Sequence, residues 1–168
     1  MTTEALKELL AKVEVAKVPD RELDAEVWWH LSGSRLIRPL DRRRAENHGV
    51  PATLDGMFSF GWRNSESDVP GYTTSIDAAL ALVERVLPNF WVSSGLCALT
   101  GHASMGPDYN GPAGDELRKL WPEDPFDAGF HADLAPGDGR HRQCFAILHC
   151  ALQALIAKAL LAQGGDHA

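Results

Sequence analysis

Apolar positions recur at helical spacing near the beginning of the chain and predict two helices there. Thr2 or Thr3 can cap the first, MTTEALKELLAKVE, and Asp20 can cap the second, DRELDAEVWWHL. Trp28 and Trp29 widen the apolar surface of the second helix and could equally open a strand. The two apolar stripes consist of Leu6, Leu9, Leu10 and Val13, and of Leu23, Val27 and Leu31.

Two further helices are predicted later in the chain. In YTTSIDAALALVERVLP, Thr74 stands three residues before Asp77, which is the arrangement of a capping box. The final helix, roughly Arg140–Ala162, is apolar almost all round, so we expect it at the centre of the fold with Leu152 buried. Its polar strip is predicted to face solvent and consists of Arg142, His149 and Gln153.

Short apolar runs separated by glycines predict antiparallel strands between these helices, with Trp91 in the core. The runs lie at residues 90–92, 96–99, 102–105 and 130–134. Residues 32–71 are rich in glycine and proline and predict a loop-rich insertion, with one short strand at Met57–Trp62. We therefore expect an α+β fold forming one domain over residues 1–168.

Composition narrows the classes of partner. With 16 Lys and Arg against 23 Asp and Glu, the formal charge is −7, which disfavours binding to long nucleic acid but permits a local site for a small anion. Three cysteines without close pairs favour a reducing compartment. The amphipathic beginning is unlike a signal peptide, and charges or polar residues interrupt the apolar runs before the ~18 residues of a membrane span. We expect a cytoplasmic protein in a bacterial host cell, with no membrane partner and no cofactor.

Three segments together resemble the phage ABA sandwich domain family: DRELDAEV, YTTSIDAALALVERVLP leading into FWV, and CFAILHCALQALIAKAL. YTTSIDAAL is the most specific of them. The resemblance implies an antiparallel sheet sandwiched between helices, encoded by a phage or prophage, and it implies no established activity or catalytic residues. The long segments 32–71 and 106–127, and HADLAPGDGRHRQC before the last helix, depart from the family pattern.

The turn before the last helix is the first candidate site. Gly139 precedes Arg140, His141 and Arg142, and a helix start with free N–H groups and added cations favours an anion such as phosphate. The alternative is a plain turn with solvated arginines, in which Asp138 caps the helix and supplies the negative charge.

Aromatic and arginine side chains in the middle of the chain form a second candidate site. Trp62, Arg63 and Tyr72 could stack on a nucleobase and bind its phosphate, whereas Tyr72 could instead pack against the helix that follows it. A third reading is a metal site built from His131, Asp133 and His141, although no HExxH or paired CxxC accompanies them.

These patterns favour a non-enzymatic phage accessory protein that sequesters a small anionic ligand, for example a nucleotide immune signal. No phosphate loop, dinucleotide fingerprint or nucleophile elbow is present in the sequence, which counts modestly against an enzyme. Two alternatives stay open: a small metal-assisted hydrolase, and a phage structural or protein-interaction module. Whether the chain forms a homo-oligomer is left open as well.

Overall fold

The computed structural model describes residues 2–32, 69–97, 100–121, 129–134 and 141–164. The described elements are five helices and one three-stranded antiparallel sheet, which confirms the α+β class. Their order is α1 (Thr3–Val15), α2 (Arg21–Ser32), α5 (Ile76–Val86), β1 (Phe90–Leu96), β2 (Gly101–Pro107), α6 (Gly114–Leu120), β3 (Phe130–Leu134) and α7 (His141–Gly164). Most of the predicted insertion and its strand at 57–62 lie outside the described residues.

The sheet has the order β1-β2-β3, and its register pairs Trp91 with Gly106 and Ser104 with His131. The separate short strands predicted at 90–92, 96–99 and 102–105 are wrong in their bounds. Gly95 does not interrupt β1, and its partner across the ladder is His102, so Phe90–Leu96 and Gly101–Pro107 form two strands of seven residues each.

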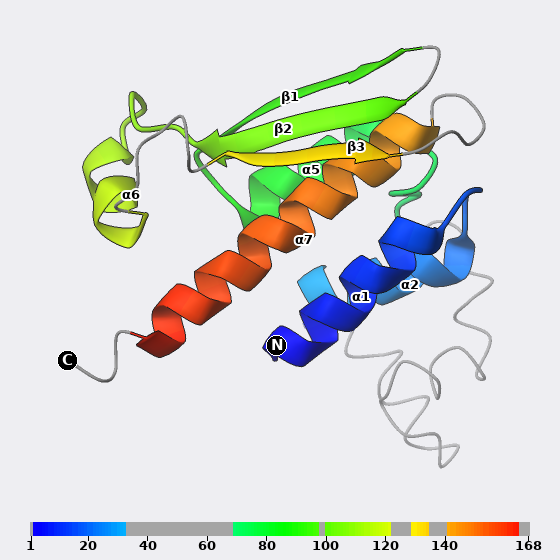
Figure 1. Cartoon of the computed structure of the whole chain (residues 1–168), viewed down its shortest axis with the longest axis horizontal. Coiled ribbons are helices and arrows are strands. Elements are labelled where there is room, and N and C mark those ends of the chain that lie inside the picture. The colour runs from blue at the N-terminus through cyan, green and yellow to red at the C-terminus, as the bar shows by residue number, and fades with distance from the viewer. Residues whose placement is uncertain (1, 33–68, 98–99, 122–128, 135–140, 165–168) are drawn as a thin grey trace, which may run out of the picture.

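Helices α1, α2, α5 and α7 lie in layers on one side of this sheet, and α6 lies beyond one end of it (Figure 1). Helices α5 and α7 cover its inner face, and α1 packs against the opposite side of α7, with α2 beside α1. The apolar contacts between sheet and helices come from Ala103, Met105 and Ala132 on the strands. The other face of the sheet is not covered by any of the described helices, whereas the sandwich predicted by resemblance would place helices on both faces.

Helix α7 is central, as its composition predicts. It contacts all three strands, α1 and α5, and Leu152 is completely buried. Burial ends toward its C-terminus, where Leu160 and Leu161 are exposed and the helix runs past the sheet (Figure 1). The stretch His141–Gln163 is also long and apolar enough to cross a membrane by length and composition. Because 56% of an 18-residue window of that stretch is buried inside the structure, its composition also fits the core helix of a globular fold.

Side chains cap three of the helices, and two of these caps confirm predictions. Thr2 accepts a hydrogen bond from the Ala5 N–H, and Asp20 accepts from the first N–H groups of α2. For α5 the predicted cap is wrong by one residue, because Ser75 accepts from the Ala78 N–H at 3.2 Å. Thr74 instead donates its hydroxyl to the Gly71 carbonyl at 3.1 Å and closes the preceding turn.

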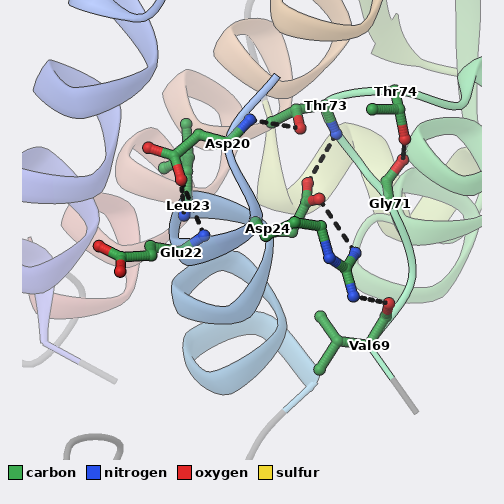
Figure 2. A network of polar contacts seen from close by, with 9 residues as sticks. Asp20, Glu22, Leu23, Asp24, Val69, Gly71, Thr73 and Thr74 are labelled. Atoms are coloured by element: carbon green, nitrogen blue, oxygen red, sulfur yellow. Dashed lines mark hydrogen bonds and ion pairs between the residues drawn. The ribbon is translucent and has the colours of Figure 1, made fainter. Parts of the chain in front are cut away.

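A buried acid joins α2 to this turn (Figure 2). Asp24 is fully buried and accepts from the Thr73 N–H at 2.7 Å, while Arg21 pairs with its other oxygen at 3.2 Å. Arg21 also donates to the Val69 carbonyl. Burial raises the pKa of the Asp24 carboxyl, and the bonds from Thr73 and the charge of Arg21 oppose that rise.

Two further side chains are placed differently from the prediction. Trp91 was expected in the core, but it is 38% exposed because strand alternation turns it to the uncovered face of the sheet. His149 was expected in solvent, but it is buried, and its Nε2 lies 3.0 Å from Glu14 Oε1. Helix α1 covers His149, which belongs to the strip of α7 that the sequence predicts to face solvent.

Candidate anion-binding site

The candidate site lies where α7 begins, against the inner face of β2. Gly101 makes this approach possible, because a Cβ at that position would lie 2.4 Å from the backbone carbon of Arg142. Gln143 fixes the first turn of α7 to the sheet by donating to the Ser94 hydroxyl at 2.9 Å. The helix start is therefore held between the beginning of β2 and the end of β1.

Arg142 carries the unusual feature of this region. Its Nε and Nη1 atoms are buried, and neither has a hydrogen-bond partner in the described part of the chain. The Nδ1 atom of His141 is buried and unpartnered as well. Buried polar groups are nearly always paired, and a buried guanidinium without an acceptor is costly. Two donors are thus held in place without an acceptor from the described residues.

The electrostatics of the first turn point the same way. No acidic residue lies in the first turn of α7, so no described carboxylate there offsets the positive end of the helix. The N–H groups of that turn have no partner within the helix, because the first four donors of a helix never do. The first turn therefore offers free backbone N–H groups to an anion.

The other predicted binding residues fall in two groups. Gly139, Arg140, Trp62 and Arg63 lie outside the described residues, as does Asp138. Tyr72 is 1% exposed and belongs to the core cluster around α1 and α2, and its hydroxyl accepts from Arg85 at 3.3 Å. Its ring is therefore packed in the interior and is not presented beside His141 and Arg142.

The structure separates the three residues of the predicted metal site. His131 and Asp133 are exposed on the outer face of β3, whereas His141 starts the helix on the inner face. His131 Nδ1 is hydrogen-bonded to the Ser104 hydroxyl at 2.8 Å. Within the described ranges, no group of three or more His, Cys, Asp or Glu side chains is arranged to hold a metal ion. This geometry contradicts a metal site built from these three residues.

The buried thiols are not arranged for nucleophilic chemistry. Cys144 and Cys150 are completely buried, and burial raises the pKa of their thiols to about 11 and about 12, with Asp24 and Asp133 adding smaller effects. Both thiols are protonated at neutral pH, and Cys150 donates to the Ala103 carbonyl at 3.4 Å. They pack as small apolar residues in the core.

Sequence reasoning missed two polar contacts between residues that are far apart in the chain. The pairing of Asp24 with Thr73 spans 49 residues, and that of Glu14 with His149 spans 135, so neither leaves a local pattern. The outward side chains of the sheet did leave a signal, because Trp91 and Ser93 alternate with Phe90 and Val92.

Comparison of the chain with protein-family models, with curated proteins and with solved structures gave no match. The resemblance to the phage ABA sandwich family therefore stays a prediction from the sequence, and the site must be interpreted from its own chemistry.

Proposed function

We propose that this protein binds and sequesters a small anionic ligand at the start of α7. The observation that carries the proposal is the pair of buried guanidinium nitrogens of Arg142 that lack an acceptor among the described residues. A phosphate group would supply the missing acceptor oxygens and accept from the first N–H groups of α7 at the same time. Arg140, next to this turn in the sequence, would add a second cation.

A phosphate-bearing small molecule fits the overall charge better than a polymer does. The net charge of −7 repels a long phosphate backbone, whereas a single phosphate needs only a local positive site. A nucleotide signal of host defence, sequestered by a phage or prophage protein, would combine this chemistry with the resemblance noted in the sequence. We propose binding without turnover; among the described residues, no group of three or more His, Cys, Asp or Glu side chains could hold a metal ion for hydrolysis.

The test is a thermal-shift screen of mononucleotides and cyclic dinucleotides, with inorganic phosphate as the probe that has no base. Calorimetric titration of the best ligand then compares the wild type with Arg142→Gln and with the double variant Arg140→Gln/Arg142→Gln. Each charge-assisted contact is worth ~1.5–3 kcal/mol, so we expect affinity to fall about tenfold in the single and about a hundredfold in the double variant. Rising salt should weaken wild-type binding as well.

Lys119→Gln is the matched control, because it removes the same charge from an exposed position on α6. It should bind like the wild type, and circular dichroism should show all variants folded. Equal affinity of the wild type and the double variant would refute the anion site. Chromatography of the recovered ligand separates binding from catalysis: an intact ligand supports sequestration, and a cleaved one contradicts it.

A protein-interaction role is the second candidate, and a specific surface favours it. An open, mainly apolar groove of about 500 Å³ lies between α1, α7 and the beginning of β3. Its apolar lining includes Leu10, Phe130, Ile156 and Leu160. Sedimentation velocity over a range of concentrations, with Leu160→Glu as the variant, tests whether copies associate there. If the wild type is a monomer at every concentration, self-association through this groove is excluded.

A further inference from the structure

The uncovered face of the sheet presents a second surface with chemistry of its own. Strand alternation turns Trp91 and Ser93 of β1, Ser104 of β2, and His131 and Asp133 of β3 to this face. It is the opposite face from the one on which α7 begins, so nothing here depends on the site at Arg142.

Trp91 lies over the backbone of β2 on this face. Three atoms of its indole, Cζ2, Nε1 and Cε2, would lie 3.1, 3.1 and 3.2 Å from a Cβ added at Gly106, its partner across the ladder. These atoms form one edge of the indole, so that edge is packed on the glycine. The residue is 38% exposed, so part of the indole remains open to solvent.

Hydrogen-bonding groups lie in the next row of the sheet. Ser93 is paired with Ser104, which is paired with His131, so the three form one row across the strands. This row stands two residues from Trp91, about 7 Å along the strand. The bond of 2.8 Å between Ser104 Oγ and His131 Nδ1 fixes the imidazole and leaves its Nε2 available at the surface.

We propose that this face binds a flat, uncharged heterocycle of the nucleoside class, stacked on Trp91 with its polar edge toward Ser93, Ser104 and His131. Stacking suits a partly exposed indole, because an aromatic side chain accepts any base in this way. Apart from two histidines, the ionisable side chain that β1 to β3 turn outward is Asp133. Because it is acidic, binding of a phosphate to this face is disfavoured. A surface with one indole surrounded by hydroxyl groups is also too small and too polar to form the core of a protein–protein interface.

The test is a titration of the isotope-labelled full chain with adenosine, followed by NMR at the Trp91 indole N–H. That resonance is assigned by its absence from the spectrum of Trp91→Ala. We expect adenosine to shift it, and calorimetry or the remaining shifts to show at least about a fivefold loss of affinity in Trp91→Ala. Val15→Ala, which changes an exposed apolar residue at the end of α1, should bind like the wild type.

A second variant guards against misfolding of Trp91→Ala. Gly106→Ala adds the Cβ that would crowd the indole at 3.1 Å, so it should lift the ring and weaken adenosine binding while the indole itself is kept. Unchanged affinity in both variants would overturn the proposal. So would binding of methyl β-glucoside in preference to adenosine, no shift with adenosine at millimolar concentration, or a shift that follows protein concentration without ligand. Because adenosine carries no phosphate, failure here leaves the site at Arg142 untouched.

Discussion

Asp24 and two side-chain nitrogens of Arg142 are buried, but their surroundings differ. The Asp24 carboxylate has the Thr73 N–H and the Arg21 guanidinium as partners. Two buried nitrogens of Arg142 have none among the described residues. A buried charge that has hydrogen-bond partners can be explained by the elements that it joins. A buried charged group without partners lowers the stability of the fold, so its presence calls for another explanation. From this contrast we attribute Asp24 to structure and propose Arg142 for binding, and the two residues should differ in their effects on stability.

The largest loss of stability should come from the apolar core, which sets the scale for the comparison. Leu152 is completely buried on α7, so Leu152→Ala should lower the free energy of unfolding by about 2–5 kcal/mol. Urea denaturation measures it. Leu161→Ala, at an exposed position on the same helix, is the control and should change little. Equal stability of both variants would mean that α7 is not the centre of the core.

Removing the Asp24 carboxylate should cost less than that, but more than a surface change. Asp24→Ala leaves the buried Thr73 N–H without its acceptor, which costs about 1–3 kcal/mol. Asp24→Asn keeps an acceptor oxygen and should be the milder variant. If Asn and Ala were equally harmful, the negative charge rather than the hydrogen bond to Thr73 would be what joins α2 to the turn before α5.

The pH dependence of Asp24→Asn sharpens the same point. Because burial raises the pKa of Asp24 in the folded state, the native protein prefers the protonated acid. The stability that protonated Asp24 contributes is fully present below the ordinary pKa of 3.8, and it is lost as pH rises through the pKa of the folded state. The stability of Asp24→Asn relative to wild type should therefore increase with rising pH over that window. A relative stability that falls over this window would contradict the assignment.

The cap of α5 should have a smaller effect. Ser75→Ala removes the bond to the Ala78 N–H and should cost on the order of 1 kcal/mol. Thr74→Ala removes only an exposed bond to the Gly71 carbonyl and should stay within about 0.5 kcal/mol. Thermal unfolding of the two variants side by side decides which residue caps the helix, and the reverse order would restore the prediction made from the sequence.

Local patterns predicted the parts of this fold that depend on neighbours in the chain. The caps at Thr2 and Asp20, the strand at 130–134 and the central α7 follow from spacing alone. The burial of Asp24 and His149 depends on Thr73 and Glu14, which are remote in sequence. Whether helices cover one face of a sheet or both is equally a property of packing, which local patterns do not show. For that reason the sequence wrongly predicts Trp91 in the core.

For the candidate site, the sequence singled out the start of α7 but could not reveal the burial of the Arg142 nitrogens. Glycine and arginine before an apolar helix pointed to Arg142, yet only the packing of α7 on Gly101 shows that its nitrogens are buried without an acceptor. The spacing of His131, Asp133 and His141 suggested a metal site, but the sheet and the helix place them on opposite faces.

The most direct test is the stability of Arg142→Met, measured by urea denaturation with and without inorganic phosphate. Without phosphate, methionine should cost less than about 0.5 kcal/mol or should stabilise the protein, because it removes unpaired buried donors while keeping length and helix propensity. With phosphate, the wild type should gain stability by ligand linkage beyond the gain of Arg142→Met, and Lys119→Met should respond like the wild type. A loss above about 1.5 kcal/mol without phosphate, together with identical responses to phosphate, would show that Arg142 serves the fold and would contradict the anion site.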